Sequence, residues 1–129
     1  MNIIIIVFLL SIFSLCGAEI KGKVIKVYDG DTITVLDDLD GGKFRIRLAG
    51  IDAPEKGEPG DKEATAFLTD RLLGQPVIVR YKTIDIYRRP LGIVWHKGEN
   101  ISEILLKKGL AKKYRAKKAN VKSNRTIYK

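Results

Sequence analysis

The feature that most limits the fold is a series of short runs rich in β-branched residues, each closed by a turn signal. Residues 20–27 (IKGKVIKV) and 31–37 (DTITVLD) alternate roughly between apolar and polar side chains and are separated by Tyr-Asp-Gly. The next turn holds Asp-Gly-Gly at 40–42, where glycine can take positive φ, and 43–49 (KFRIRLA) then alternates strictly. This spacing predicts three consecutive antiparallel strands.

Two helical patterns and two more strands follow. Apolar residues at helical spacing between 64 and 72 predict a helix that Asp61 caps and that ends before Gly74. Residues 76–82 (PVIVRYK) and 91–97 (LGIVWHK) have strand character. Asn100 with Glu103 predicts a capping box for a second helix, which Gly109 ends. The order βββ-α-ββ-α favours an α+β fold, a five-stranded OB-fold barrel with two to three packed helices.

The N-terminal segment has a different character. Its apolar run, residues 3–15, is 13 residues long and is followed by Gly17 and Ala18. A spanning helix needs about 20 residues, so the pattern predicts a signal peptide at residues 1–18 rather than a membrane anchor. Cys16, the only cysteine, would be removed with it. The alternative is a lipoprotein signal in which Cys16 is acylated, although Leu15 is a poor match to the small residue that such cleavage prefers. We therefore expect an exported protein, secreted or held in the cell envelope, without disulfides.

The charge of the chain is unevenly distributed. Of its 24 Lys and Arg residues, ten lie in 107–129, which holds no acid, while the other 14 are balanced by 15 Asp and Glu. A cationic C-terminal segment favours phosphate backbones or anionic surfaces, and it is equally typical of a solvated end that keeps a protein soluble. We expect one domain at residues 19–115 and a flexible basic tail at 116–129.

Three separate segments concentrate acids and arginines near predicted strand ends: 28–32 (YDGDT), 47–55 (RLAGIDAPE) and 85–92 (DIYRRPLG). Taken singly, each is explained by ordinary turn chemistry or solvated charge. Taken together, they predict a site for a metal and a phosphate.

The donor types at this predicted site indicate which metal it suits. Asp31, Asp52, a backbone carbonyl near Ala53 and Glu55 offer the hard oxygen ligands that Ca²⁺ prefers. Zinc of the usual type is disfavoured, because the sequence supplies no Cys or His cluster. Two arginines at 47 and 89 add planar donors that match phosphate oxygens. This combination would attract a phosphodiester and stabilise the charge of its transition state.

From about Lys21 to Tyr114 the sequence resembles the staphylococcal nuclease (thermonuclease) family. The resemblance rests on DGDTITV, RLAGIDAPE and DIYRRPLGIVW in this order, with FLTDRLLGQPV and GENISEILLKKGLA between and after them. It implies an enzyme, a calcium-dependent endonuclease that hydrolyses DNA and RNA with little sequence specificity and leaves 3′-phosphates. It implies a monomer without a protein partner, acting on single strands or frayed duplexes.

By position, the resemblance implies roles for the residues at the predicted metal. Asp31 and Asp52 would be the calcium ligands, with the backbone carbonyl of Ala53 as a third. Glu55 would contact the metal indirectly and activate or orient the attacking water. Asp29 would be an acid close to the metal.

The remaining implied roles concern the substrate. Arg47 would bind and polarise the phosphate at the metal, and Arg89 would hold it from the opposite side and help the leaving oxygen depart. Tyr87 and Tyr114 would contact the nucleotide, and core packing explains each of them equally well.

The sequence also departs from the family pattern around the second arginine. Arg88 stands where the family usually has glycine, Pro90 follows the catalytic arginine, and Ile86 replaces a basic residue. A bulky residue at 88 is expected to alter the turn and move Arg89. The alternative function, from a different class, is an OB-fold protein that binds nucleic acid without catalysis.

Overall fold

The computed structural model describes residues 17–114. The predicted signal peptide at residues 1–18 lies almost wholly outside this range, as does the predicted tail at 116–129, so both stay predictions. Within 17–114, no helix is long and apolar enough to cross a membrane.

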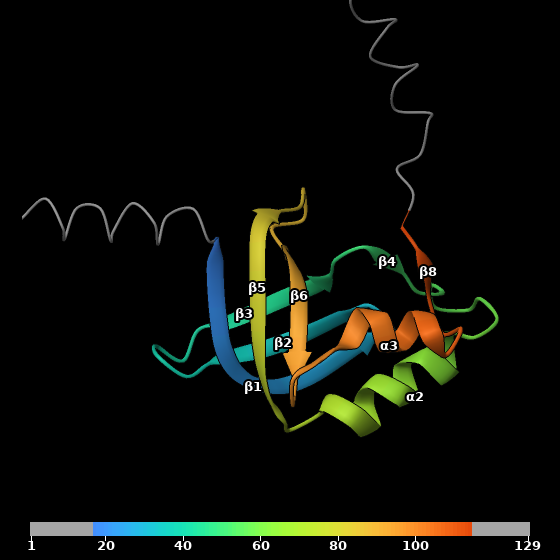
Figure 1. Ribbon diagram of the computed structural model, residues 1–129, viewed down its shortest axis with the longest axis horizontal. Helices are drawn as coiled ribbons and strands as arrows, with labels where there is room; N and C mark the ends of the chain where they lie inside the picture. The colour runs from blue at the N-terminus through green and yellow to red at the C-terminus, as the bar shows by residue number, and fades with distance from the viewer. Residues whose placement is uncertain (1–16, 115–129) are drawn as a thin grey trace, which may run out of the picture.

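Five strands form a closed barrel (Figure 1). Their neighbours run in the order β3-β2-β1-β5-β6, and a parallel pairing of β3 with β6 closes the sheet through Arg47 opposite Leu91 and Leu48 opposite Gly92. The strands are β1 (Ala18–Asp29), β2 (Thr32–Asp37), β3 (Lys43–Leu48), β5 (Pro76–Ile84) and β6 (Pro90–His96). The predicted α+β class and the five-stranded OB-fold barrel are therefore confirmed.

Three two-residue strands were not predicted from the sequence. They are β4 (Ile51–Asp52), β7 (Glu99–Asn100) and β8 (Lys112–Lys113). β7 extends the sheet beyond β6, while β4 and β8 pair with each other outside the barrel. A strand of two residues is too short to show an alternating pattern of apolar and polar side chains. Such a strand is recognised only from the residues with which it pairs.

Two helices, α2 (Asp61–Leu72) and α3 (Ile101–Lys107), lie together on one side of the barrel (Figure 1). α3 begins as predicted, because the Asn100 side chain caps it by accepting a hydrogen bond from the Ser102 N–H. The predicted cap of α2 is wrong by one residue. Gly60, at φ 91°, is its N-cap, and Asp61 is the first helical residue, with a carboxylate that accepts from the Gly57 and Lys62 N–H groups.

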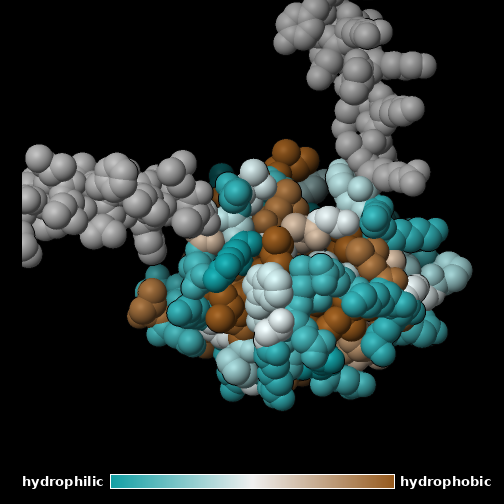
Figure 2. All heavy atoms as spheres, viewed as in Figure 1, coloured by the Kyte–Doolittle hydropathy of each residue, from teal (hydrophilic) through white to brown (hydrophobic). Residues whose placement is uncertain are grey.

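The core fills the barrel and the space between barrel and helices. Alternate residues of each strand point inward, as the sequence pattern predicts, and polar side chains cover most of the face seen in Figure 2. Barrel closure requires Gly92, because a Cβ there would lie 2.6 Å from a Val79 methyl and 3.1 Å from an Ile46 methyl. The largest fully buried side chains are Ile33, Ile46, Leu48, Ile51, Leu68, Leu72, Ile101, Leu105, Val24, Val35, Val79 and Val94.

Candidate active site

The turn between β1 and β2 carries the first acid of the site. Its backbone is fixed by two hydrogen bonds, in which the Asp31 N–H donates to Asp29 Oδ1 at 3.0 Å and the Leu48 N–H donates to the Asp31 carbonyl at 2.8 Å. Gly30 lets other segments approach, since a Cβ there would lie 2.7 Å from the Ala64 Cβ and 2.8 Å from the Ala53 Cβ. At this Asp-Gly-Asp turn, the barrel, α2 and the loop after β4 therefore pack closely together, and glycine is needed because it has no side chain.

The carboxylate of Asp31 is buried, with 7% of the residue exposed. The Ala53 N–H donates to its Oδ2 at 2.9 Å and the Thr32 hydroxyl donates to its Oδ1 at 3.1 Å. Burial raises the pKa of Asp31 to about 6, against the lowering effects of the Ala53 N–H and the Arg47 charge, and Asp29 adds to the rise. Its protein partners therefore compensate its negative charge only in part.

Arg47 connects the two acids that the sequence analysis assigned to a metal. Its Nη2 lies 3.3 Å from Asp31 Oδ2 and 3.3 Å from Asp52 Oδ1, and its Nη1 donates to the Leu48 carbonyl at 2.7 Å. The Arg47 side chain is only 13% exposed, whereas the Asp52 side chain is 62% exposed. The structure thus brings together Asp31 from the turn before β2, Arg47 from β3 and Asp52 from β4.

The second predicted arginine approaches from the loop between β5 and β6. Asp85 holds it, since Arg89 Nε donates to Asp85 Oδ2 at 2.8 Å and the Arg89 N–H donates to Oδ1 at 2.9 Å. Arg89 Nη1 then reaches the Thr32 hydroxyl at 3.5 Å, next to Asp31. Arg88 takes φ 61°, the left-handed conformation that favours glycine. Asp85 fixes the position of Arg89 in this loop, and the expectation that Arg88 moves Arg89 stays a prediction.

Three other predicted residues lie on the surface. Glu55 is exposed in the loop after β4, and its side chain has no hydrogen bond or ion pair among residues 17–114. Tyr87 is 72% exposed and its ring lies 5.2 Å from the Arg89 guanidinium, while Tyr114 is 59% exposed and its N–H donates to the Gly50 carbonyl. Core packing, the alternative considered for both tyrosines, is wrong.

Two residues that position the site were missed. Thr32 is fully buried and links Asp31 to Arg89. Asp85 caps its own loop, accepting from the N–H groups of Tyr87 and Arg89 while pairing with the Arg89 side chain. The signal for Asp85 was present, because an aspartate that opens a turn commonly binds the backbone two residues later.

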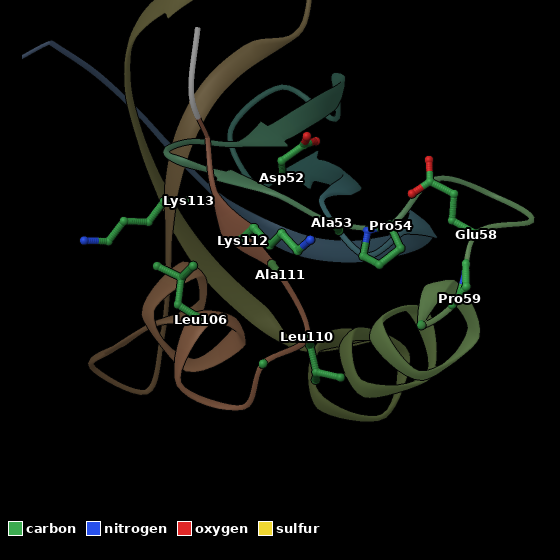
Figure 3. Close-up of a pocket in the computed structure, with 12 residues that line it drawn as sticks. Asp52, Ala53, Pro54, Glu58, Pro59, Leu106, Leu110, Ala111, Lys112 and Lys113 are labelled. Atoms are coloured by element: carbon green, nitrogen blue, oxygen red, sulfur yellow. The ribbon is translucent and has the colours of Figure 1, made fainter. Parts of the chain in front are cut away.

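A cleft of about 1150 Å³ opens beside Asp52. Its lining comes from two segments, residues 52–60 and 106–113 (Figure 3). Lys112 and Lys113 belong to β8, which pairs with β4 so that Lys112 lies opposite Asp52. Positive side chains therefore border the cleft next to the acids, as a site for a polyanion requires.

The donors at the site are of the kind that suits a hard divalent cation. Asp31 is a buried carboxylate whose charge is only partly compensated, and Asp52 faces the same guanidinium nitrogen. Within residues 17–114, no group of three or more acidic, His or Cys side chains surrounds one point. A cation held here would therefore complete its coordination with backbone carbonyls and water, as Ca²⁺ commonly does.

Comparison with known proteins agrees with this arrangement. The sequence model of the family described as "Staphylococcal nuclease homologue" matches residues 45–129. The chain is 37% identical over 107 residues to "Micrococcal nuclease" of Shigella flexneri, an alignment covering 76% of this chain and 60% of that protein. It is 38% identical over 108 residues to an "Uncharacterized endonuclease" of Escherichia coli O157:H7, covering 83% and 69% respectively.

A third relative comes from another genus. "Thermonuclease" of Staphylococcus hyicus is 41% identical over 98 residues, covering 70% of this chain and 57% of that protein. The chain thus spans roughly 60 to 70% of the length of these relatives. The OB-fold barrel and the grouped acids and arginines agree with these matches. The chain therefore belongs to the staphylococcal nuclease family.

Proposed function

We propose that this protein is a calcium-dependent nuclease that hydrolyses phosphodiester bonds of DNA and RNA with little sequence specificity and leaves 3′-phosphates. The observation that carries the proposal is the position of Arg47 Nη2, which lies 3.3 Å from both Asp31 and Asp52. Arg89 is linked to the Asp31 carboxylate through the Thr32 hydroxyl. The names of the relatives, micrococcal nuclease and thermonuclease among them, support the reaction class.

Asp31, Asp52 and the Ala53 carbonyl are the groups that would hold Ca²⁺. The ion would supply positive charge that neutralises the phosphate and polarises its P–O bonds. The protein itself holds the two carboxylates apart and fixes their orientation. The Ala53 N–H and the Thr32 hydroxyl fix the Asp31 carboxylate, which leaves it little freedom to rotate.

Arg47 and Arg89 bind the phosphate in this mechanism. Each guanidinium is permanently charged and offers a planar set of donors matched to phosphate oxygens. Both arginines keep a carboxylate partner in the structure, Asp31 and Asp52 for Arg47 and Asp85 for Arg89. These acids pre-orient the guanidinium groups, so that little reorganisation is needed when negative charge grows on the phosphate.

Glu55 activates or orients the attacking water. Its exposed carboxylate has no competing partner in residues 17–114. The water oxygen attacks phosphorus in line with the 5′ oxygen and Glu55 accepts a proton from the water. The bond from phosphorus to the 5′ oxygen breaks, and this oxygen takes a proton from solvent. Arg89 stabilises the departing oxygen by hydrogen bonding. A single strand or a frayed duplex suits this site best, because both arginines must reach one phosphate.

Digestion of plasmid DNA and of RNA, with millimolar Ca²⁺ or with a chelator, tests the proposal. We expect cleavage only with Ca²⁺, and end-group analysis should find 3′-phosphates. Glu55→Gln and Arg47→Ala should each lower kcat by roughly 10²–10⁴-fold, with circular dichroism unchanged. Glu63→Gln, which neutralises an exposed acid on α2, is the matched control and should cleave normally.

Two outcomes would contradict this mechanism in different ways. Cleavage that is indifferent to chelation would exclude the calcium mechanism. Binding of DNA without cleavage under either condition would instead favour the alternative, an OB-fold protein that holds nucleic acid without catalysis.

We also propose that the protein is exported and acts as a monomer. The apolar N-terminal segment supports export. Cell fractionation would test it, and metabolic labelling with palmitate would distinguish a lipidated Cys16 from a removed signal peptide. Sedimentation equilibrium at micromolar concentration tests the monomer.

A further inference from the structure

A row of residues with a basic side chain at each end lies directly beside the row that carries Arg47 of the candidate active site. Across β1, β2 and β3, Asp29 pairs with Thr32 and Thr32 with Arg47. Two positions further along β2 and β3, Lys26 pairs with Thr34 and Thr34 with Arg45. Residues two apart share a face of a strand and lie about 7 Å from each other. Arg45 and Arg47 are therefore neighbours on one surface.

Tyr28 lies between these two rows. The register of β1 against β2 shifts between Val27 and Asp29, which leaves Tyr28 without a pairing partner at the bulge. Its ring is approached by three cations: Lys56 Nζ lies 4.1 Å from the ring centroid, Arg45 Cζ 4.3 Å and Lys26 Nζ 5.8 Å. These three side chains and the ring are called the Tyr28 cluster below.

The cations of the cluster lack full counter-charges. Within residues 17–114, no acid lies within 4 Å of the charged nitrogens of Lys26, Arg45 or Lys56 (the only ion pairs are elsewhere). Asp61 borders the same surface, but both its carboxylate oxygens already accept from backbone N–H groups. The face of an aromatic ring attracts cations without neutralising them. Three positive charges are thus held close together and repel one another.

We propose that the Tyr28 cluster is a phosphate-binding subsite for the nucleic-acid strand, next to the phosphate that is cleaved. The proposal rests on the proposed nuclease function. A strand whose reactive phosphate lies at Arg47 and that continues along β3 passes Arg45, and its next phosphates meet three cations that have no ion-pair partner within residues 17–114. Lys56 follows Glu55 directly, so the loop that carries the water-activating acid also grips the substrate. Tyr28 is a positioning residue, whose ring gathers the cations.

Binding of a fluorescein-labelled oligothymidylate of about ten nucleotides, within the usual site size of an OB fold, tests this in the presence of chelator. Anisotropy titrations of the full chain from about 50 to 200 mM salt give the affinity and its salt slope. Arg45→Gln with Lys56→Gln should weaken binding on the order of tenfold and reduce the slope by about 0.7 per lost phosphate contact. Tyr28→Leu should also weaken binding, and Tyr28→Phe should restore it.

Lys23→Gln is the matched control. This residue is exposed on the same strand β1, three positions or about 10 Å from Lys26, so the variant removes one charge outside the Tyr28 cluster, whereas the double variant removes two charges within it. It should keep the wild-type affinity and slope. If the double variant binds no worse than Lys23→Gln, the proposal is overturned.

Cleavage kinetics with Ca²⁺ separate this proposal from the nuclease function. In the double variant, the weaker binding should raise the KM for the oligonucleotide and leave kcat unchanged. The KM for a dinucleotide should rise less, because it does not reach the Tyr28 cluster. A wild-type protein that never cleaves, with a double variant that still loses affinity and slope, would refute the nuclease function and support the subsite. Cosedimentation with phosphatidylserine vesicles tests the other source of phosphate, and a loss confined to vesicle binding would overturn the subsite.

Discussion

Replacing Asp31 by asparagine should stabilise the protein while removing a proposed metal ligand. Burial raises the pKa of this carboxylate from 3.8 to about 6. Each unit corresponds to 1.36 kcal/mol, so keeping the group ionised at neutral pH costs about 3 kcal/mol of folding free energy. Asparagine carries no charge, and its carbonyl oxygen can still accept from the Ala53 N–H, which now donates to Oδ2. In the presence of chelator, the gain of Asp31→Asn should therefore approach this value.

The pH dependence of the gain identifies its cause. Because the folded state holds a proton on Asp31 more tightly than the unfolded chain does, the contribution of Asp31 to wild-type stability rises as pH falls from above 6 towards 4. The variant lacks this rise, so the difference in stability should shrink over the same interval. His96 acts in the opposite direction in both proteins, and its contribution cancels in the difference.

Thermal and urea unfolding of both proteins, with chelator, at about pH 7.5, 6 and 4.5 would measure this difference. For a domain of this size, 1 kcal/mol moves the Tm by about 4–8 °C, so a rise on the order of 10 °C is expected at the highest pH. A variant that is no more stable than the wild type there, or a difference that stays constant on acidification, would refute the argument that burial of an ionised Asp31 strains the fold. Added Ca²⁺ should stabilise the wild type alone.

Three further predictions concern the backbone and pH. Arg88→Gly should raise the free energy of unfolding by about 0.5–1 kcal/mol in urea, because relief of the left-handed strain at φ 61° exceeds the added chain entropy; a loss of stability would mean that Arg88 is not strained. Gly30→Ala should lower it by about 1–3 kcal/mol, since the new Cβ would collide with Ala53 and Ala64, and unchanged unfolding would contradict this tight packing. Burial lowers the pKa of His96, aided by nearby positive charges, so its neutral form favours folding and the wild type should lose that stability as pH falls below 6.5. His96→Gln should flatten this part of the pH profile, and an identical profile would exclude His96 as its source.

Much of the barrel could be read from local sequence. The alternation in residues 43–48 places Ile46 and Leu48 in the core and Arg45 and Arg47 on the opposite face, as observed. The first residue of α3 was also predictable, because Asn100 is a strong N-cap. Short pairings such as β4 with β8 were not, since two residues carry no periodicity of their own.

The sequence named several residues of the candidate site, but it missed Thr32 and Asp85 and could not show the contacts. Three motifs named Asp31, Arg47, Asp52 and Arg89, and no local pattern could show that one guanidinium nitrogen lies equally close to two of the acids. The left-handed backbone of Arg88 and the ion pair of Arg89 with Asp85 could not be predicted from the sequence either, because both depend on how the loop folds.

By itself, the sequence determined the order of the five barrel strands and the two helices, their apolar faces and the residue types available for phosphate chemistry, because hydrophobic alternation and turn preferences act over a few neighbouring residues. Only the tertiary structure decided how buried Asp31 is, which acids Arg47 connects, and that Tyr28 gathers Lys26, Arg45 and Lys56. Those properties depend on barrel closure, which sets distances between segments far apart in the chain, and charges respond to distance and burial rather than to sequence spacing.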